Sequence, residues 1–163
     1  MSIAMRMQIH CDQPTHRKHL MKTKLFVTSL VLLSTIASAE SLEDKKYWKG
    51  EMDYINKTLD TTNESCGTKL TFDFVDKPKL RAEADKAESS ASGVCDVIID
   101  EIGGLCRVGD DEKQAVKAKI KGIRCGYSKP RSLAMTGGIV TYMGNNLEAN
   151  VTEWARPWLM KHL

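Results

Sequence analysis

The chain has 163 residues, with 24 Lys and Arg against 21 Asp and Glu, and four histidines. Five of the cations and one acid lie in residues 1–39, so residues 40–163 carry 19 cations against 20 acids, which argues against a nucleic-acid binder that relies on clustered cation excess. Only His162 remains in that part, which argues against catalysis by a Ser/His/Asp or Cys/His system and against a His-rich zinc site.

Residues 21–39, MKTKLFVTSLVLLSTIASA, have the three parts of a secretory signal peptide. Lys22 and Lys24 form a short positive end, an apolar block follows, and Ala37 and Ala39 occupy the positions that a signal peptidase reads. The uncharged run is shorter than the ~20 apolar residues needed to cross a bilayer, so no stable membrane span is expected. We therefore predict a secreted or periplasmic protein that is cleaved near Ala39.

Residues 1–20 show no apolar period and end in basic residues, which is unusual before a signal peptide. We expect that translation begins at Met21 and that residues 1–20 come from an upstream start or a vector. A genuine extended n-region is the alternative. Residues 40–163 contain no low-complexity linker, internal repeat or shift in composition, so they predict a single secreted domain.

The first half of this domain predicts helices around one strand. Residues 41–60 place apolar side chains at helical spacing after a Ser41–Asp44 pair that resembles a capping box. Residues 68–76 alternate between apolar and polar, as a strand with one buried face does. Residues 78–102 are helical again, and the polar run at 88–93 is a possible break into two helices. Gly103 and Gly104 are expected to end this segment.

The second half predicts a helix, three strands and a closing helix. Residues 109–122 have acids in the first turn and lysines in the last, which matches the helix dipole. The β-favouring runs 123–127, 132–135 and 139–143 follow, and paired glycines before the last run indicate a hairpin. Asn145 with Glu148 resembles the cap of a last helix, which Pro157 would kink or divide. These elements predict an α+β domain in which a small antiparallel sheet of about four strands packs against about four helices.

Four cysteines remain after the signal peptide, and an even count in an exported domain predicts two disulfides. No CxxC pair occurs, so zinc or thioredoxin-like chemistry is poorly supported. Cys95 and Cys106 lie at opposite ends of a helical run, roughly 16 Å apart, which is too far for a bond. If the next helix runs back antiparallel, Cys125 returns toward Cys95. We therefore prefer the pairs Cys66 with Cys106 and Cys95 with Cys125.

Between Lys113 and Leu147 the chain has seven cations and no acid. One hypothesis for this stretch is a surface for an anionic partner, such as an acidic protein, a lipid head group or a cell-wall polymer. The candidate partner-binding residues are Lys117, Lys121, Arg124, Lys129 and Arg131. The pattern itself favours the simpler interpretation, an ordinary solvated helix face with a basic last turn.

Two other groups of residues offer weaker hypotheses. Paired carboxylates can hydrolyse glycosides without histidine, and the best groupings are Asp73 with Asp76 and the run 110–112. These acids are also explained as strand and helix N-terminal positions. Trp154 and Trp158, one helical turn apart, form either an exposed aromatic platform or, more simply, the inner stripe of the last helix.

The sequence therefore predicts no catalytic residue, metal site or cofactor. It favours a small exported, disulfide-stabilised binding protein, for example a periplasmic inhibitor or a protective, immunity-type partner of another exported protein. The alternatives are a secreted carboxylate-dependent hydrolase acting on a glycan or cell wall, and a structural component of the envelope.

Overall fold

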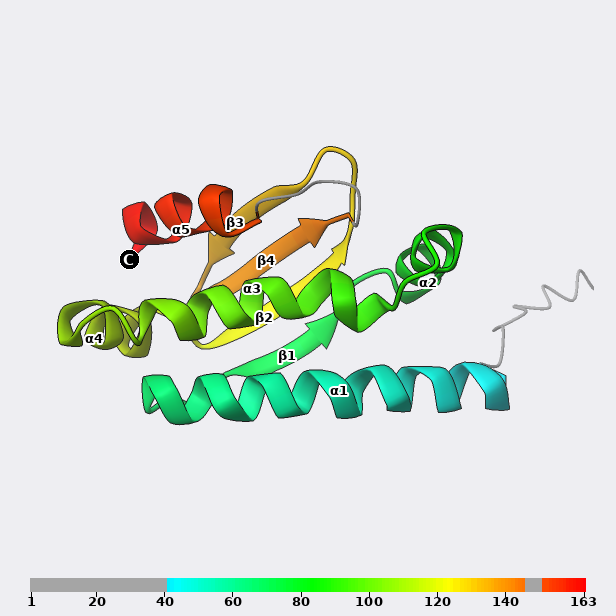
Figure 1. Ribbon diagram of the computed structural model, residues 1–163, viewed down its shortest axis with the longest axis horizontal. Coiled ribbons are helices and arrows are strands. Elements are labelled where there is room, and N and C mark those ends of the chain that lie inside the picture. The colour runs from blue at the N-terminus through cyan, green and yellow to red at the C-terminus, as the bar shows by residue number, and fades with distance from the viewer. Residues whose placement is uncertain (1–40, 146–150) are drawn as a thin grey trace, which may run out of the picture. The chain divides into compact units, whose positions relative to one another are not determined.

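The structure, a computed structural model, describes residues 41–145 and 151–163 (Figure 1). Within these residues it has five helices and four strands, in the order α1 (Leu42–Cys66), β1 (Thr71–Phe74), α2 (Lys77–Lys86), α3 (Ala91–Leu105), α4 (Asp110–Lys119), β2 (Gly122–Tyr127), β3 (Ser132–Thr136), β4 (Ile139–Gly144) and α5 (Val151–His162). The α+β class with a four-stranded sheet is confirmed. The predicted signal peptide at residues 21–39, the residues 1–20 that precede it and the expected cap residue Glu148 lie outside the described residues. None of the helices described is long and apolar enough to cross a membrane.

The sheet is mixed, and the prediction of an antiparallel sheet is wrong for two of its three strand pairs. Its order is β1-β2-β4-β3, in which β1 pairs with β2 and β2 with β4 in parallel, while β3 and β4 are antiparallel. The expected hairpin is present, and Gly137 and Gly138 form its turn with φ of 60° and 88°. These positive values explain why the turn needs glycine.

Burial explains why β4, and not β3, lies next to β2. Val140 and Tyr142 of β4 are 0% and 1% exposed, whereas every residue of β3 is exposed or only half-buried. A strand between two others buries more of its surface than an edge strand does. Burial of apolar surface therefore favours β4, with its larger inward-facing side chains, at the position next to β2. The parallel pairing of β1 with β2 follows from the three helices between them, because parallel neighbours need a long crossover.

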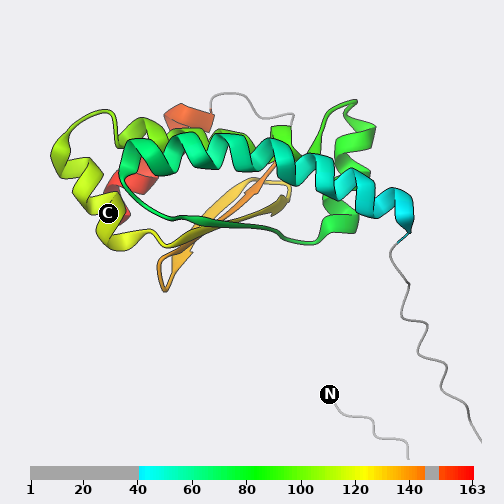
Figure 2. The same ribbon diagram turned by 90° about the horizontal axis from the view of Figure 1, so that it is seen from below.

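The helices α1, α3 and α5 lie on one side of the sheet, with α3 between the other two (Figures 1 and 2). The inward-facing strand residues Phe74, Ile123 and Val140 are buried beneath them. Helix α3 is the centre of the core, and most of its residues are buried. Among the described helices, none covers the opposite face of the sheet (Figure 2).

The helix boundaries follow tertiary contacts as well as local signals. The capping box is present, because Asp44 N donates to Ser41 Oγ at 3.0 Å and Ser41 N to Asp44 Oδ2 at 3.3 Å. Helix α1 continues beyond residue 60 because Thr62 and Cys66 extend its buried stripe. The polar run does divide α2 from α3, which Ser90 caps.

Two glycines that were expected to end a helix, and a proline that was expected to kink or divide one, lie inside their helices. Gly103 and Gly104 lie inside α3, which ends at Leu105. Gly103 packs against α1, where a Cβ would lie 2.7 Å from the hydroxyl oxygen of Thr62, so its lack of a side chain allows the two helices to approach. Pro157 lies exposed inside α5, which runs undivided.

The two disulfides join the pairs that the sequence favours. Cys66 and Cys106 have Cα atoms 5.1 Å apart and tie the end of α1 to the end of α3. Cys95 and Cys125 have Cα atoms 5.7 Å apart and tie α3 to β2. The chain returns to Cys95 along strand β2, which passes beneath α3, and not along α4 as expected.

Candidate functional site

The structure separates the five cations that the sequence grouped as a partner-binding surface. Lys117 lies in the last turn of α4, and Lys121 lies between α4 and β2. Lys129 and Arg131 follow β2, at the other end of that strand, roughly 20 Å away from Lys121 at ~3.3 Å per residue. Arg124 lies between these two ends, exposed on the open face of the sheet.

Three of the five cations have less support as partner-binding residues. Arg131 and Arg124 each lie beside a side chain of the protein, and Lys129 lies apart from the others. The guanidinium of Arg131 lies over the ring of Trp154, with Cζ 4.7 Å from the ring centroid. Arg124 is in register with Asp73 on the adjacent strand, so a carboxylate lies beside its charge. Lys129 is exposed in the β2–β3 connection. Lys117 and Lys121 of the predicted set come together at one pocket.

This pocket has a volume of about 540 Å³, and we call it the lysine pocket. Its lining residues come from the α1–β1 connection on one side and from the end of α4 and the α4–β2 connection on the other: Gly67, Thr68, Lys69, Leu70, Lys117, Ile120 and Lys121. Lys69 is the member that sequence reasoning missed. It lies 48 positions before Lys117, and no spacing rule connects the two.

The first wall is held by the turn that follows α1. Gly67 adopts a left-handed conformation with φ of 64° as the C-cap of the helix. The side chain of Asn63 fixes the residues beyond it, because its Oδ1 accepts hydrogen bonds from Leu70 N at 2.7 Å and from Thr68 Oγ1 at 3.0 Å. Thr68 N also donates to Asn63 O at 3.0 Å.

The second wall is held by backbone hydrogen bonds to its neighbours. Lys121 N donates to Gly138 O in the β3–β4 turn at 2.8 Å, and Thr71 N donates to Lys121 O at 3.3 Å. The second bond links the two walls. The backbone of the pocket is therefore fixed, while the three lysine side chains extend from it into solvent and are exposed.

The charge of the lysine pocket is uncompensated by side chains. No Asp or Glu is among its lining residues. None of its three ammonium groups forms an ion pair with a carboxylate of residues 41–145 or 151–163. An exposed pocket with three unpaired cations attracts anionic groups.

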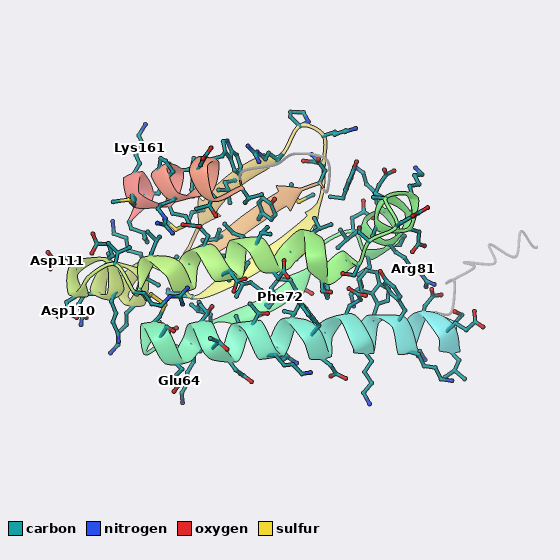
Figure 3. All side chains as sticks on the ribbon, viewed as in Figure 1. Glu64, Phe72, Arg81, Asp110, Asp111 and Lys161 are labelled. Atoms are coloured by element: carbon teal, nitrogen blue, oxygen red, sulfur yellow. A yellow bond between two sulfur atoms is a disulfide. The ribbon has the colours of Figure 1, made fainter. Side chains whose placement is uncertain are left out.

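The carboxylates of the hydrolase hypothesis are distributed over separate elements. Asp73 lies in β1, and Asp76 caps α2, where its Oδ1 accepts from Lys79 N at 3.4 Å. Asp110 and Asp111 project from the outer end of α4 (Figure 3). Within the described residues, no three or more His, Cys, Asp or Glu side chains are placed to hold a metal ion.

A second, smaller hollow lies at that end of α4. It has a volume of about 210 Å³, and its lining residues are Leu105, Asp111, Glu112, Ala115, Met160 and Leu163. The two acids therefore stand beside a mainly apolar surface between α4 and α5. They lie in the first turn of α4, where a negative side chain stabilises the helix by its interaction with the helix dipole.

The remaining candidates belong to the packing of the domain. Trp154 and Trp158 are half-buried and pack against the core, as the simpler reading of their spacing expects. Trp158 stacks on His162 with ring centroids 3.9 Å apart.

Away from the lysine pocket, burial raises the pKa of Asp96 above its ordinary value of 3.8, although Tyr54 donates a hydrogen bond to its Oδ2 at 3.1 Å.

Comparison with protein families, curated proteins and solved structures finds no match to this chain.

Proposed function

We propose that this chain is a small exported binding protein, an inhibitor or protective partner of another exported protein, and that the lysine pocket is where the partner binds. The observation that carries the proposal is that lysines from two distant segments line one pocket of about 540 Å³ that contains no acidic side chain. That volume lies within the usual range of ligand pockets, roughly 300–1,000 Å³.

The two disulfides support the exported location in this proposal. Disulfides persist in oxidising compartments such as the periplasm and the extracellular space, and they are rare in the cytosol. The four cysteine side chains are buried, so reductants reach them poorly once the domain has folded. A protein that meets its partner outside the cytoplasm benefits from such covalent restraint.

Carboxylate-dependent hydrolysis has less support from the geometry. Glycosidases place two carboxylates on either side of the scissile bond, about 5–9.5 Å apart. The lysine pocket contains no carboxylate, and the hollow beside α4 presents Asp111 and Glu112 from one helical turn next to an apolar surface. We therefore favour binding over hydrolysis.

The test is affinity capture from an envelope extract of the native host. The bait is the exported, oxidised protein, compared with K117E/K121E and with the control K45E/K49E, which changes the same charge near the start of α1. We expect one dominant exported protein, retained by the wild type and the control and lost by the pocket variant. Recovery of the same proteins by both variants, or of none by the wild type, contradicts the proposal.

A further inference from the structure

The lysine pocket lies where two helices end. Gly67 is the C-cap of α1, Ile120 is the C-cap of α4, and both line the pocket. The C-terminus of a helix carries a partial charge of about −0.5, so the two ends together contribute about −1. The ammonium groups of Lys69, Lys117 and Lys121 contribute three positive charges. The three ammonium groups outweigh the partial negative charge of the two helix ends, so the pocket attracts anionic groups.

The donors of the pocket do not suit a compact dianion such as phosphate. Phosphate sites commonly combine arginine forks, helix N-termini or nests of free backbone N–H groups, to which lysine adds a point charge. Here the helix ends are the negative ones, and all the charged side chains are lysines, which act as separate point charges. The hydroxyl of Thr68 and the N–H groups of Thr68, Leu70 and Lys121 already donate within the protein.

The arrangement of the cations suits charges spread along a chain. Lys69 extends from the wall made by α1 and β1, whereas Lys117 and Lys121 extend from the wall made by α4 and β2. Two carboxylates on neighbouring side chains can each approach one wall.

We propose that the lysine pocket binds an acidic peptide segment of the partner protein, with two Asp or Glu side chains paired to opposite walls. This inference rests on the proposed function, because it names the chemistry of the partner at the same site. The contacts are exposed, so binding weakens as salt rises and the Debye length falls from about 30 Å at 0.01 M to about 8 Å at 0.15 M.

The experiment uses purified, exported, oxidised protein and three probes at low ionic strength. The probes are a blocked tetraglutamate peptide, the matched tetraglutamine peptide and inorganic phosphate. Binding is followed by the amide chemical shifts of Thr68, Lys69 and Lys121. We expect saturable shifts with tetraglutamate, none with tetraglutamine, and at least about fivefold weaker binding of phosphate, because each exposed ion pair contributes little and several must act together.

Two lysine variants test the location of the site. K117Q/K121Q should weaken tetraglutamate binding about fivefold. K45Q/K49Q is the matched control, and both variants are titrated at 0.15 M salt, where the Debye length is about 8 Å. The control should change binding less than about twofold, because Lys49 lies roughly 26 Å along α1 from Cys66. Thermal unfolding of each variant verifies that it is folded.

Three results overturn the inference: equal binding of phosphate and tetraglutamate, equal binding of the two peptides, or equal weakening by both variants. These measurements need no partner from the host. A failed envelope capture therefore counts against the proposed function alone, and a failed peptide titration counts against the acidic segment alone.

Discussion

Removal of the disulfide between Cys66 and Cys106 should cost a large part of the stability of the domain. The variant is C66A/C106A. This bond closes a loop with a sequence separation of 40, for which restriction of the unfolded chain contributes about 4 kcal/mol. The second bond, Cys95–Cys125, has a separation of 30 and should contribute about 3.6 kcal/mol. A domain of this kind has a total free energy of unfolding of about 5–15 kcal/mol.

Packing adds to this loss, because Cys66 and Cys106 are 0% and 7% exposed and their replacement by alanine leaves small cavities. The two loops overlap between Cys95 and Cys106, so the effects of removing the two bonds are not independent.

The assay is urea unfolding of the oxidised protein without reductant, followed by tryptophan fluorescence, with C95A/C125A measured beside C66A/C106A. A loss below about 1 kcal/mol for either variant refutes the entropic reasoning. Peptide mapping under non-reducing conditions that finds other pairs refutes the connectivity itself.

Three further predictions concern single side chains. R156L should destabilise the domain by about 3 kcal/mol, because it leaves the buried carboxylate of Glu101 without its ion-pair partner. E101Q should destabilise it less. Urea unfolding of both variants and of the double variant measures the coupling between the two side chains. The raised pKa of Asp96 means that the folded state binds the proton of this carboxyl more tightly than the unfolded state does. The free energy of unfolding should therefore fall as pH rises above 3.8. D96N should flatten that part of the stability–pH curve, and an unchanged curve contradicts the assignment. G50A should raise the free energy of unfolding by up to about 1 kcal/mol, because a Cβ there meets no atom within 4 Å. G103A should lower it, because its Cβ would lie 2.7 Å from the Thr62 hydroxyl oxygen of α1. Thermal unfolding measures both variants, and changes of the same sign contradict this reasoning.

Features that depend on near neighbours in the chain could be predicted from the sequence. Ser41 and Asp44 satisfy each other's backbone groups within one turn, and Gly137 with Gly138 provides the positive φ values of a tight hairpin. The alternation around Phe72 needs only the period of a strand. The even number of cysteines after the predicted signal peptide indicated two disulfides, and the length of one helical run was enough to exclude Cys95 with Cys106.

Competition between distant segments decided the rest. The order of the strands depends on whether β3 or β4 buries more apolar surface beside β2. The pattern of residues within one strand does not contain that information. Gly103 remains inside α3 because Thr62 of another helix lies against it, which outweighs its local tendency to end a helix. The lysine pocket has the same origin. Lys69 and Lys117 are neighbours only because α1 and α4 end at the same corner of the domain, and that meeting is a property of the tertiary packing.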